Sequence, residues 1–209
     1  NTYAGLTTVS AGTLNLNKTA GTDAIAGNLT VSGGSVVLQA ANQIKNTANV
    51  VVSGGTLDIG ANDETVNNVK MTSGSLLGTS GTLSSGTAFD MQGGSAGAIL
   101  GGTAGLTASA GTTTLSKANT YTGTTTVSGG TLNVSGTLAA AGSLVVSGGT
   151  FDLQTNTQQF AGVQQTGGTI QNGTVTLNAG NYDLQGGTVS AVLAGTAGAN
   201  VTVGTTTLS

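Results

Sequence analysis

The chain contains no cysteine, histidine, proline or tryptophan, and charged residues occupy only 5% of its 209 positions. The absence of cysteine excludes disulfide bonds, thiol catalysis and cysteine-based metal sites. Without histidine, carboxylates remain as the only plausible acid–base groups. The net charge of −3 is spread thinly. It therefore provides neither a basic surface for nucleic acid nor a polybasic patch for anionic lipid.

Long apolar segments are also missing. No run approaches the roughly 18 residues that a membrane-spanning helix needs, so we expect no membrane span in this chain. The sequence begins with Asn1 rather than methionine and carries no signal peptide, which predicts a mature or excised segment. Aromatic residues make up only 3%. Because Val, Ile, Leu and Thr recur in phase and charge is scarce, the sequence favours an ordered chain over a disordered one.

Glycine is abundant, and it recurs at nearly even intervals along the whole chain. The last glycines of successive turn motifs, called anchor glycines below, are separated by 22, 21, 19, 20, 17, 19, 19, 19, 19 and 17 residues. A period near 20 residues is typical of a solenoid, in which each period forms one coil. The anchors are Gly12, Gly34, Gly55, Gly74, Gly94, Gly111, Gly130, Gly149, Gly168, Gly187 and Gly204.

In most coils, apolar side chains recur five and three residues before the anchor, and two and four residues after it. This alternation predicts two short strands, one before and one after a glycine bend, each with alternate side chains pointing inward. The sequence therefore predicts an all-β fold, a parallel β-solenoid of about 10–11 coils of roughly 19–20 residues, forming a single elongated body over 1–209. Representative inward positions are Leu29, Val31, Val36 and Leu38 in one coil and Leu144, Val146, Phe151 and Leu153 in another.

The position three residues after the anchor is expected to face water. It should form partial polar ladders there, with asparagines bonded amide to amide. On this reading Asp152→Asn would be nearly neutral. Near the 17-residue intervals the inward residues are small, so the cross-section should narrow. The outward positions are Asn15, Asp58, Asn133, Asp152 and Gln171, and the small inward ones are Ala96, Ala98, Thr113 and Ala191.

A larger repeat divides the chain into two diverged tandem units, 1–118 and 119–209. Both open with Asn-Thr-Tyr, at Asn1 and Asn119, and both close with Gly-Thr-Thr-Thr-Leu-Ser. The two end coils show no polar cap and should present unpaired backbone groups. We therefore expect that the chain continues into further repeats, or stacks end to end on another copy.

The junction between the two units carries a family resemblance. Its residues read Gly-Thr-Thr-Thr-Leu-Ser-Lys-Ala-Asn-Thr-Tyr-Thr-Gly-Thr-Thr-Thr-Val-Ser-Gly-Gly-Thr-Leu (111–132), and a weaker copy begins at Asn1. This run resembles the passenger-associated repeat of bacterial autotransporters, which are large surface adhesins and related proteins of the type V secretion class. The resemblance implies a right-handed parallel β-helix at the extracellular surface of a Gram-negative bacterium. The outer-membrane translocator barrel of that class is not in this sequence, so export is implied by the resemblance alone.

Few residues are candidates for catalysis. Asp63 and Glu64 are adjacent, but neighbours on a strand point apart, and a pair in a loop is expected to be solvated surface. Asp90 and Asp183 occupy equivalent coils of the two units, far apart along the rod. The sequence therefore predicts no catalytic, cofactor-binding or metal site, no cofactor, and no enzymatic activity.

Two other kinds of site are disfavoured. Calcium β-rolls need an aspartate in each short repeat, whereas most turns here read Ser-Gly-Gly-Thr. Tyr3 and Tyr121 could be platforms for stacking sugars, but packing at the coil junction is the favoured interpretation.

Together these patterns favour a structural and adhesive surface protein, a rod that supports attachment, fibres or biofilm. The possible partners are further repeats or copies of the chain itself, and a host or matrix ligand. Two alternatives stay open, a self-stacking protomer of an extracellular filament and a polysaccharide-active β-helix enzyme.

Overall fold

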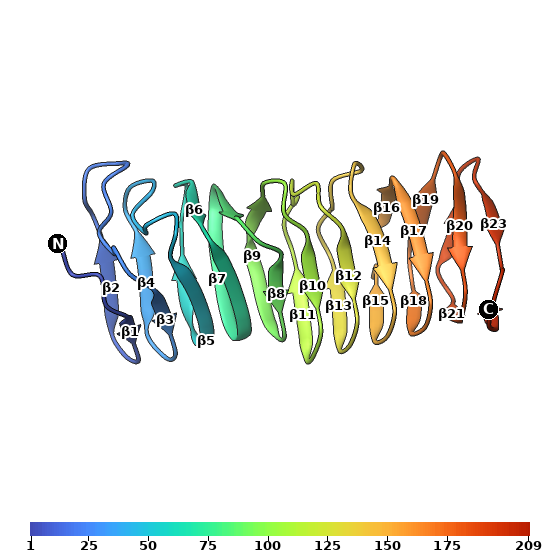
Figure 1. Cartoon of the computed structure of the whole chain (residues 1–209), viewed down its shortest axis with the longest axis horizontal. Helices are drawn as coiled ribbons and strands as arrows, with labels where there is room; N and C mark the ends of the chain where they lie inside the picture. The colour runs from blue at the N-terminus through green and yellow to red at the C-terminus, as the bar shows by residue number, and fades with distance from the viewer.

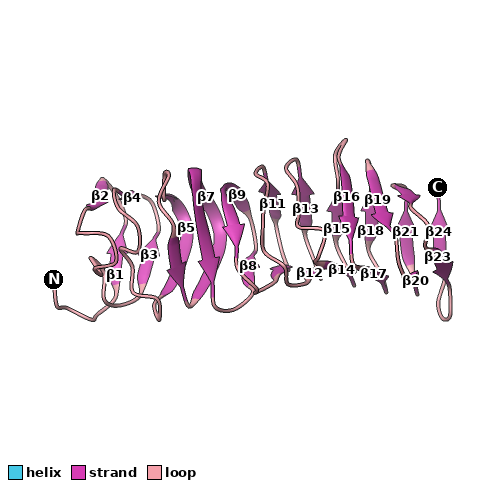
Figure 2. Ribbon diagram, turned by 90° about the horizontal axis from the view of Figure 1, so that it is seen from above, coloured by secondary structure: helices cyan, strands magenta, loops and turns pink.

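The glycine period winds the chain into stacked coils. The computed structural model describes all residues 1–209, contains strands and no helix, and forms a rod with the two termini at opposite ends (Figures 1 and 2). Every strand pairing is parallel and joins one coil to the next. The prediction of a parallel β-solenoid of about 11 turns is thus confirmed.

Each coil has a first side that precedes the anchor glycine and a second side that follows it. β5 and β7 are long enough to run through the bend and belong to both sides. The first side contains β1 (Thr7–Val9), β3 (Leu29–Val31), β5 (Asn49–Asp58), β7 (Asn68–Ser85), β8 (Phe89–Met91), β10 (Leu106–Ala108), β12 (Thr125–Val127), β14 (Ser143–Val146), β17 (Gly162–Gln165), β20 (Asn181–Leu184) and β23 (Gly198–Asn200). The second side contains β2 (Thr13–Leu16), β4 (Ser35–Leu38), β9 (Gly94–Gly101), β11 (Thr112–Leu115), β13 (Thr131–Val134), β15 (Thr150–Asp152), β18 (Thr169–Gln171), β21 (Gly187–Val189) and β24 (Thr206–Leu208).

A third side closes each coil and is paired less regularly. β6 pairs with the end of β7, which pairs with the end of β9, and β16, β19 and β22 form a separate three-stranded sheet. Elsewhere on this side only isolated bridges occur, such as Ile25 with Ile44. The remaining bounds are β6 (Glu64–Val66), β16 (Thr157–Phe160), β19 (Thr174–Leu177) and β22 (Val192–Ala194).

The apolar residues predicted to face inward form one continuous core of 45 buried residues. The predicted inward Val, Ile, Leu, Met, Phe and Tyr side chains beside the anchor glycines are buried, with exceptions only in the two end coils: Leu14 is partly buried in the first, and Val201 and Leu208 are exposed in the last. The offsets read from the sequence therefore give the correct phase, because alternate residues of a strand face the same way.

Glycine at the bends serves two purposes. Nine anchor glycines, all except Gly34 and Gly55, have a positive φ, which is costly for residues with a side chain. A Cβ on Gly55 would collide with the carbonyl oxygen of Gly34 in the preceding coil. The expectation of a positive dihedral is wrong at Gly34 and Gly55, where close approach of neighbouring coils is the reason for glycine instead.

The two short 17-residue periods share a displacement in strand register that the glycine spacing alone does not predict. Leu115 stands four residues after its anchor, yet it pairs with Ala96, which stands two after its own. Leu208 pairs with Val189 in the same displaced way. Ala96 is thereby flanked by Leu76 and Leu115, so large neighbours lie on both sides of the small residue.

Candidate functional site

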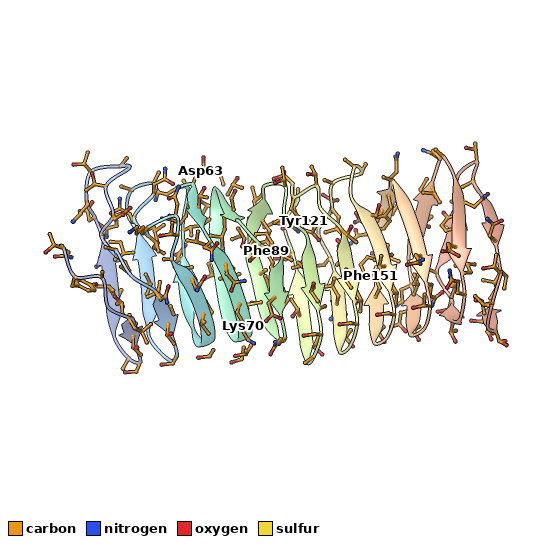
Figure 3. The ribbon with its side chains drawn as sticks, in the orientation of Figure 1. Asp63, Lys70, Phe89, Tyr121 and Phe151 are labelled. Carbon is orange, nitrogen blue, oxygen red and sulfur yellow. The ribbon has the colours of Figure 1, made fainter.

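The adjacent acidic residues Asp63 and Glu64 lie on opposite sides of the chain. Asp63 is exposed near the edge of the rod (Figure 3), where its Oδ1 accepts a hydrogen bond from the amide of Thr82 at 2.8 Å. Glu64 begins β6 and is fully buried. The expectation that the two point apart is confirmed, but the expectation of a solvated pair is wrong for Glu64. The two carboxylates therefore cannot act together on one substrate.

Glu64 uses its carboxylate to satisfy backbone groups of the preceding coil. Its Oε2 accepts hydrogen bonds from the amides of Gln43 at 2.7 Å and Ile44 at 3.2 Å, while Oε1 has no partner. Burial raises the pKa of Glu64 from 4.5 to about 7, although the backbone bonds oppose that shift and the nearby Asp23 adds to it. Near neutral pH the residue is thus divided between its charged and neutral forms.

Two glutamines perform the same task in other coils. Gln43 Oε1 accepts a hydrogen bond from the amide of Lys18 at 2.7 Å, and Gln158 Oε1 accepts one from the amide of Leu138 at 2.9 Å. Both side chains are buried. On the third side, where strand pairing is interrupted, a buried polar side chain from the next coil therefore replaces the missing backbone partner. Gln43, Glu64 and Gln158 are called the inter-coil polar residues below.

These contacts belong to a corner, the bend between the second and the third side of a coil, that recurs with similar residues in two coils. Asn62 Nδ2 donates to the carbonyl of Leu38 at 2.9 Å, and Asn156 Nδ2 donates to the carbonyl of Val134 at 2.8 Å. Each asparagine stands two residues before an inter-coil polar residue. An aspartate, Asp58 or Asp152, stands four residues before each asparagine. This spacing of Asp, Asn and Glu or Gln is present in the sequence and is the signal that identifies the corner, although the alternation of apolar residues does not predict it.

Asp152 departs from its expected place facing water, since only 7% of the residue is exposed. Its carboxylate accepts hydrogen bonds from the side-chain amides of Gln171 and Asn172, both at 2.8 Å, and from the amide of Gln154 at 2.7 Å. Burial raises the pKa of Asp152, but these hydrogen bonds outweigh it and the net pKa is lowered. Asp152 keeps its predicted place in the outer row, opposite Asn133 and Gln171, but the expectation that it faces water is wrong, because three donors cover the carboxylate.

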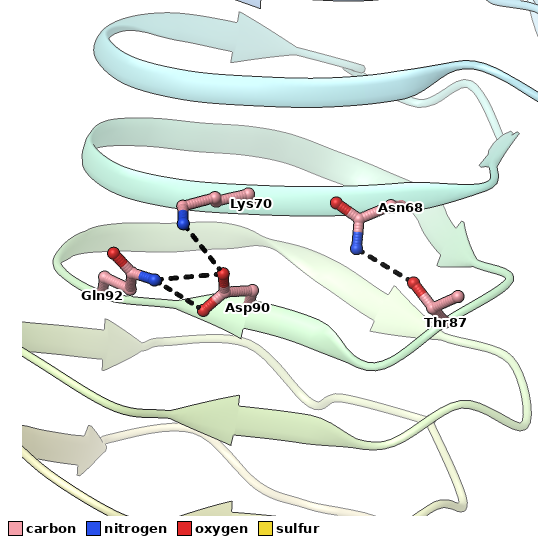
Figure 4. A network of polar contacts seen from close by, with 5 residues as sticks. All are labelled: Asn68, Lys70, Thr87, Asp90 and Gln92. Atoms are coloured by element: carbon pink, nitrogen blue, oxygen red, sulfur yellow. Dashed lines mark hydrogen bonds and ion pairs between the residues drawn. The ribbon is translucent and has the colours of Figure 1, made fainter.

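The equivalent aspartates of the two units, Asp90 and Asp183, lie in the outer row of the first side and make matching contacts. Asp90 accepts hydrogen bonds from Gln92 and forms an ion pair with Lys70, with 3.3 Å between Nζ and Oδ2 (Figure 4). Asp183 accepts hydrogen bonds from Gln185 and from the Nε2 of Gln164 at 2.9 Å. Each carboxylate thus receives one donor from its own coil and one from the preceding coil.

The predicted ladder of asparagine amides is not found three residues after the anchors. Asn15 pairs with Val37, so no amide stands beside it in the next coil. An amide–amide bond occurs instead at the start of the first side, where Asn67 Nδ2 donates to Asn49 Oδ1 at 2.8 Å. One coil nearer the N-terminus, Asn28 Oδ1 accepts a hydrogen bond from the backbone N–H of Asn49 at 2.9 Å.

The two tyrosines of the repeated Asn-Thr-Tyr motif make the same local bond in different surroundings. Tyr121 bonds Thr125 Oγ1 at 2.8 Å, and Tyr3 bonds Thr7 Oγ1 at 2.9 Å. Tyr121 is buried, its pKa is raised by that burial, and its ring centroid lies 6.2 Å from that of Phe89 (Figure 3). Tyr3 is 46% exposed. The packing interpretation is thus confirmed for Tyr121.

The structure contains no pocket, and no three His, Cys, Asp or Glu residues are grouped so that they could hold a metal ion. No segment forms a helix of the length and hydropathy needed to cross a membrane.

Comparison with known proteins yields one match. The family described as passenger-associated-transport-repeat matches residues 1–16 and 108–134, the start of the chain and the junction that contains Tyr121. No curated protein and no solved structure matches the chain. The two matched segments, wound within a parallel β-solenoid of about 11 turns, fit the repeat of an autotransporter passenger.

Proposed function

We propose that the chain is a non-enzymatic structural segment of a surface adhesin, a β-helical stalk that holds an adhesive element away from a Gram-negative cell. The observation that carries this proposal is the uninterrupted parallel ladder, which joins every coil to the next on both the first and the second side. Such a ladder places backbone hydrogen bonds along the rod axis. Each added coil lengthens the rod by about 4.8 Å.

The distribution of polar groups supports a role outside the cell, where ionic conditions vary. A single ion pair is present, between Lys70 and Asp90, and both side chains are partly exposed. Exposed ion pairs contribute about 0–1 kcal/mol and are screened by salt. The rod is instead held by its aliphatic core and backbone bonds, so its stability should change little with ionic strength.

The flat outer faces support adhesion through many weak contacts. They present rows of hydroxyl and amide groups from Thr, Ser, Asn and Gln, with few charges. Contacts of this kind are individually weak, and affinity would come from many copies acting together. The proposed ligand is therefore a repetitive host or matrix surface.

Surface display tests this function. The chain is placed between a secretion signal and an outer-membrane translocator in a Gram-negative host, with an epitope at its N-terminal end. We expect protease-resistant display and increased attachment of the cells to matrix-coated surfaces. Soluble chain added as competitor should reduce the attachment.

Deletions supply the matched control. Removing 131–149, one whole 19-residue period, should keep the rod displayed and resistant to protease. Removing 131–140 leaves only nine residues of that period, too few to close a coil, and should make the rod sensitive to protease. Displayed, folded rods that leave attachment unchanged would contradict the adhesive role, and equal resistance of the two deletions would contradict the rod itself.

A filament protomer is the second candidate, because apolar side chains are exposed at both ends of the rod. Leu6 is 63% exposed near the N-terminus and Leu208 is 64% exposed near the C-terminus. Turnover of a surface polysaccharide, abolished by Asp63→Asn, would instead support the remaining alternative of an enzyme.

A further inference from the structure

We propose that the C-terminal coil of one copy of this chain binds the N-terminal coil of a second copy, in the register of the junction between the two units. This inference rests on the proposed rod function and names its partner. The internal junction, where β10 and β11 meet β12 and β13, is the template. There Leu106 pairs with Thr125 and Leu115 pairs with Val134.

The C-terminal coil reproduces the upstream half of that template. Gly204 and the five residues after it repeat the sequence that begins at Gly111. The fold repeats as well, since both coils show the same two-residue displacement against the preceding strand. The two coils also share an unsatisfied buried hydroxyl, because the equivalent residues Thr113 and Thr206 both bury an Oγ1 that has no hydrogen-bond partner. β23 and β24 therefore present to a following coil the same kind of strand edge that β10 and β11 present to β12 and β13.

The N-terminal coil reproduces the downstream half. The bond between Tyr3 and Thr7 is that between Tyr121 and Thr125, moved by 118 residues. In the internal junction Asn119 Oδ1 also accepts the amide of Leu100 in the preceding coil at 3.0 Å. Asn1 occupies the equivalent place in the first coil. It can bond a preceding coil in the same way.

The side chains that the junction buries are exposed at the two ends. Leu115 is fully buried, whereas its counterpart Leu208 is 64% exposed. Tyr121 is 1% exposed, whereas Tyr3 is 46% exposed. Val201, 59% exposed, is the counterpart of a fully buried alanine. Joining the ends in the template register would cover these apolar groups and pair the edge strands, both of which favour association.

The template fixes the register residue by residue. Moving the β10–β12 and β11–β13 pairs by the repeat offsets places Val201 opposite Val9 of the second copy, and Leu208 opposite Leu16. On the outer face it places Asn200 opposite Thr8. The same complementarity joins consecutive units within one polypeptide, whatever precedes or follows these residues there.

Because the chain lacks cysteine, introduced cysteines report this register directly. Opposed residues on neighbouring parallel strands lie about 4.8 Å apart, within the Cα range of disulfides. The double variant T8C/N200C carries its cysteines at opposite ends of the rod and can form this bond only between copies. We expect it to give a ladder of covalent multimers under mild oxidation. T30C/N200C is the matched control, since Thr30 lies one coil further along the same row.

A second measurement separates end-on binding from other association. Leu208→Asp changes a side chain that is exposed in the single chain, so folding should be unaffected while multimers are lost in sedimentation velocity. Leu77→Asp, at a side chain 40% exposed on a lateral face, should leave them unchanged. Equal cross-linking of T8C/N200C and T30C/N200C, or equal loss of multimers in both aspartate variants, would overturn the proposal.

A third variant keeps the rod and the end contact distinguishable. T107C/T126C joins the paired outer residues of the internal junction and should form an intramolecular disulfide. If that bond forms while T8C/N200C yields only monomer, the end-to-end contact is refuted and the rod stands. If neither bond forms, the solenoid is refuted as well.

Discussion

Replacement of Glu64 by glutamine should alter how stability depends on pH. The carboxyl has a pKa of about 7 in the folded chain against 4.5 as its ordinary value. A raised carboxyl pKa means that folding favours the protonated form. Glu64 therefore does not lower the free energy of unfolding below pH 4.5, but lowers it increasingly as the pH rises toward 7. The difference of about 2.5 pH units corresponds to roughly 3 kcal/mol above pH 7.

Glutamine should remove that cost without losing the contact. Gln43 and Gln158 already accept backbone amides of the preceding coil through their Oε1 atoms. The amide group of the new side chain would take the place of Glu64 Oε1, the carboxylate oxygen that has no partner. We expect Glu64→Gln to have nearly the wild-type stability at pH 4.5. At pH 8 it should be more stable by roughly 3 kcal/mol.

Urea denaturation followed by circular dichroism at pH 4.5, 6, 7 and 8 measures this difference. Asp63→Asn is the matched control, because it removes a neighbouring carboxylate that faces water. The difference in free energy of unfolding between Asp63→Asn and the wild type should not grow with pH as it does for Glu64→Gln. If the wild-type and Glu64→Gln stabilities run parallel across this range, the carboxyl does not titrate in a buried site and the reasoning is refuted.

Three further predictions follow from single contacts, each measured by urea or thermal unfolding. Thr113→Val should stabilise the chain by about 1 kcal/mol, because it removes a buried hydroxyl that has no hydrogen-bond partner. Thr125→Val should destabilise it by a similar amount, because Tyr121 loses its hydrogen bond. Changes in stability of the same sign in both variants would contradict this. Gly180→Ala should cost about 1–2 kcal/mol through its positive φ alone, and Gly149→Ala about 1–3 kcal/mol more, because its Cβ would lie 2.5 Å from the carbonyl oxygen of Gly130; equal costs would refute the close approach. Asp152→Asn should destabilise by about 1–3 kcal/mol at neutral pH. Since the pKa is lowered, this loss should vanish as the pH falls below 3.8, and a neutral effect at pH 7 would restore the expectation that Asp152 faces water.

The coil phase was predictable from the sequence because it depends on local alternation. On each side of a bend the strand is short, and the glycine marks where one strand ends and the next begins, so the offsets place Val146 and Phe151 inside without knowledge of the other coils. The correspondence of two aspartates, one in each expected unit, was visible in the same way. Asp90 and Asp183 do occupy matching positions and accept matching bonds.

The corner beyond each second-side strand was not predictable by that rule. Alternation stops there, and the inward position is decided by which backbone amides of the preceding coil lack a strand partner. Glu64 is buried because the amides of Gln43 and Ile44 need an acceptor, a requirement that arises only between coils. The displacement at Leu115 has the same origin, since a 17-residue period changes the register against the coil before it.

Distances along one outer row test the stacked-coil architecture most directly. From Thr30 the pairings run through Val51, Lys70, Asp90 and Thr107 to Thr126 in five steps, and reach Asp183 after three more. Spin labels on the cysteine variants T30C/T126C and T30C/D183C should therefore give electron–electron distances of about 24 Å and 38 Å. Distances that do not rise by about 4.8 Å per coil would contradict the solenoid.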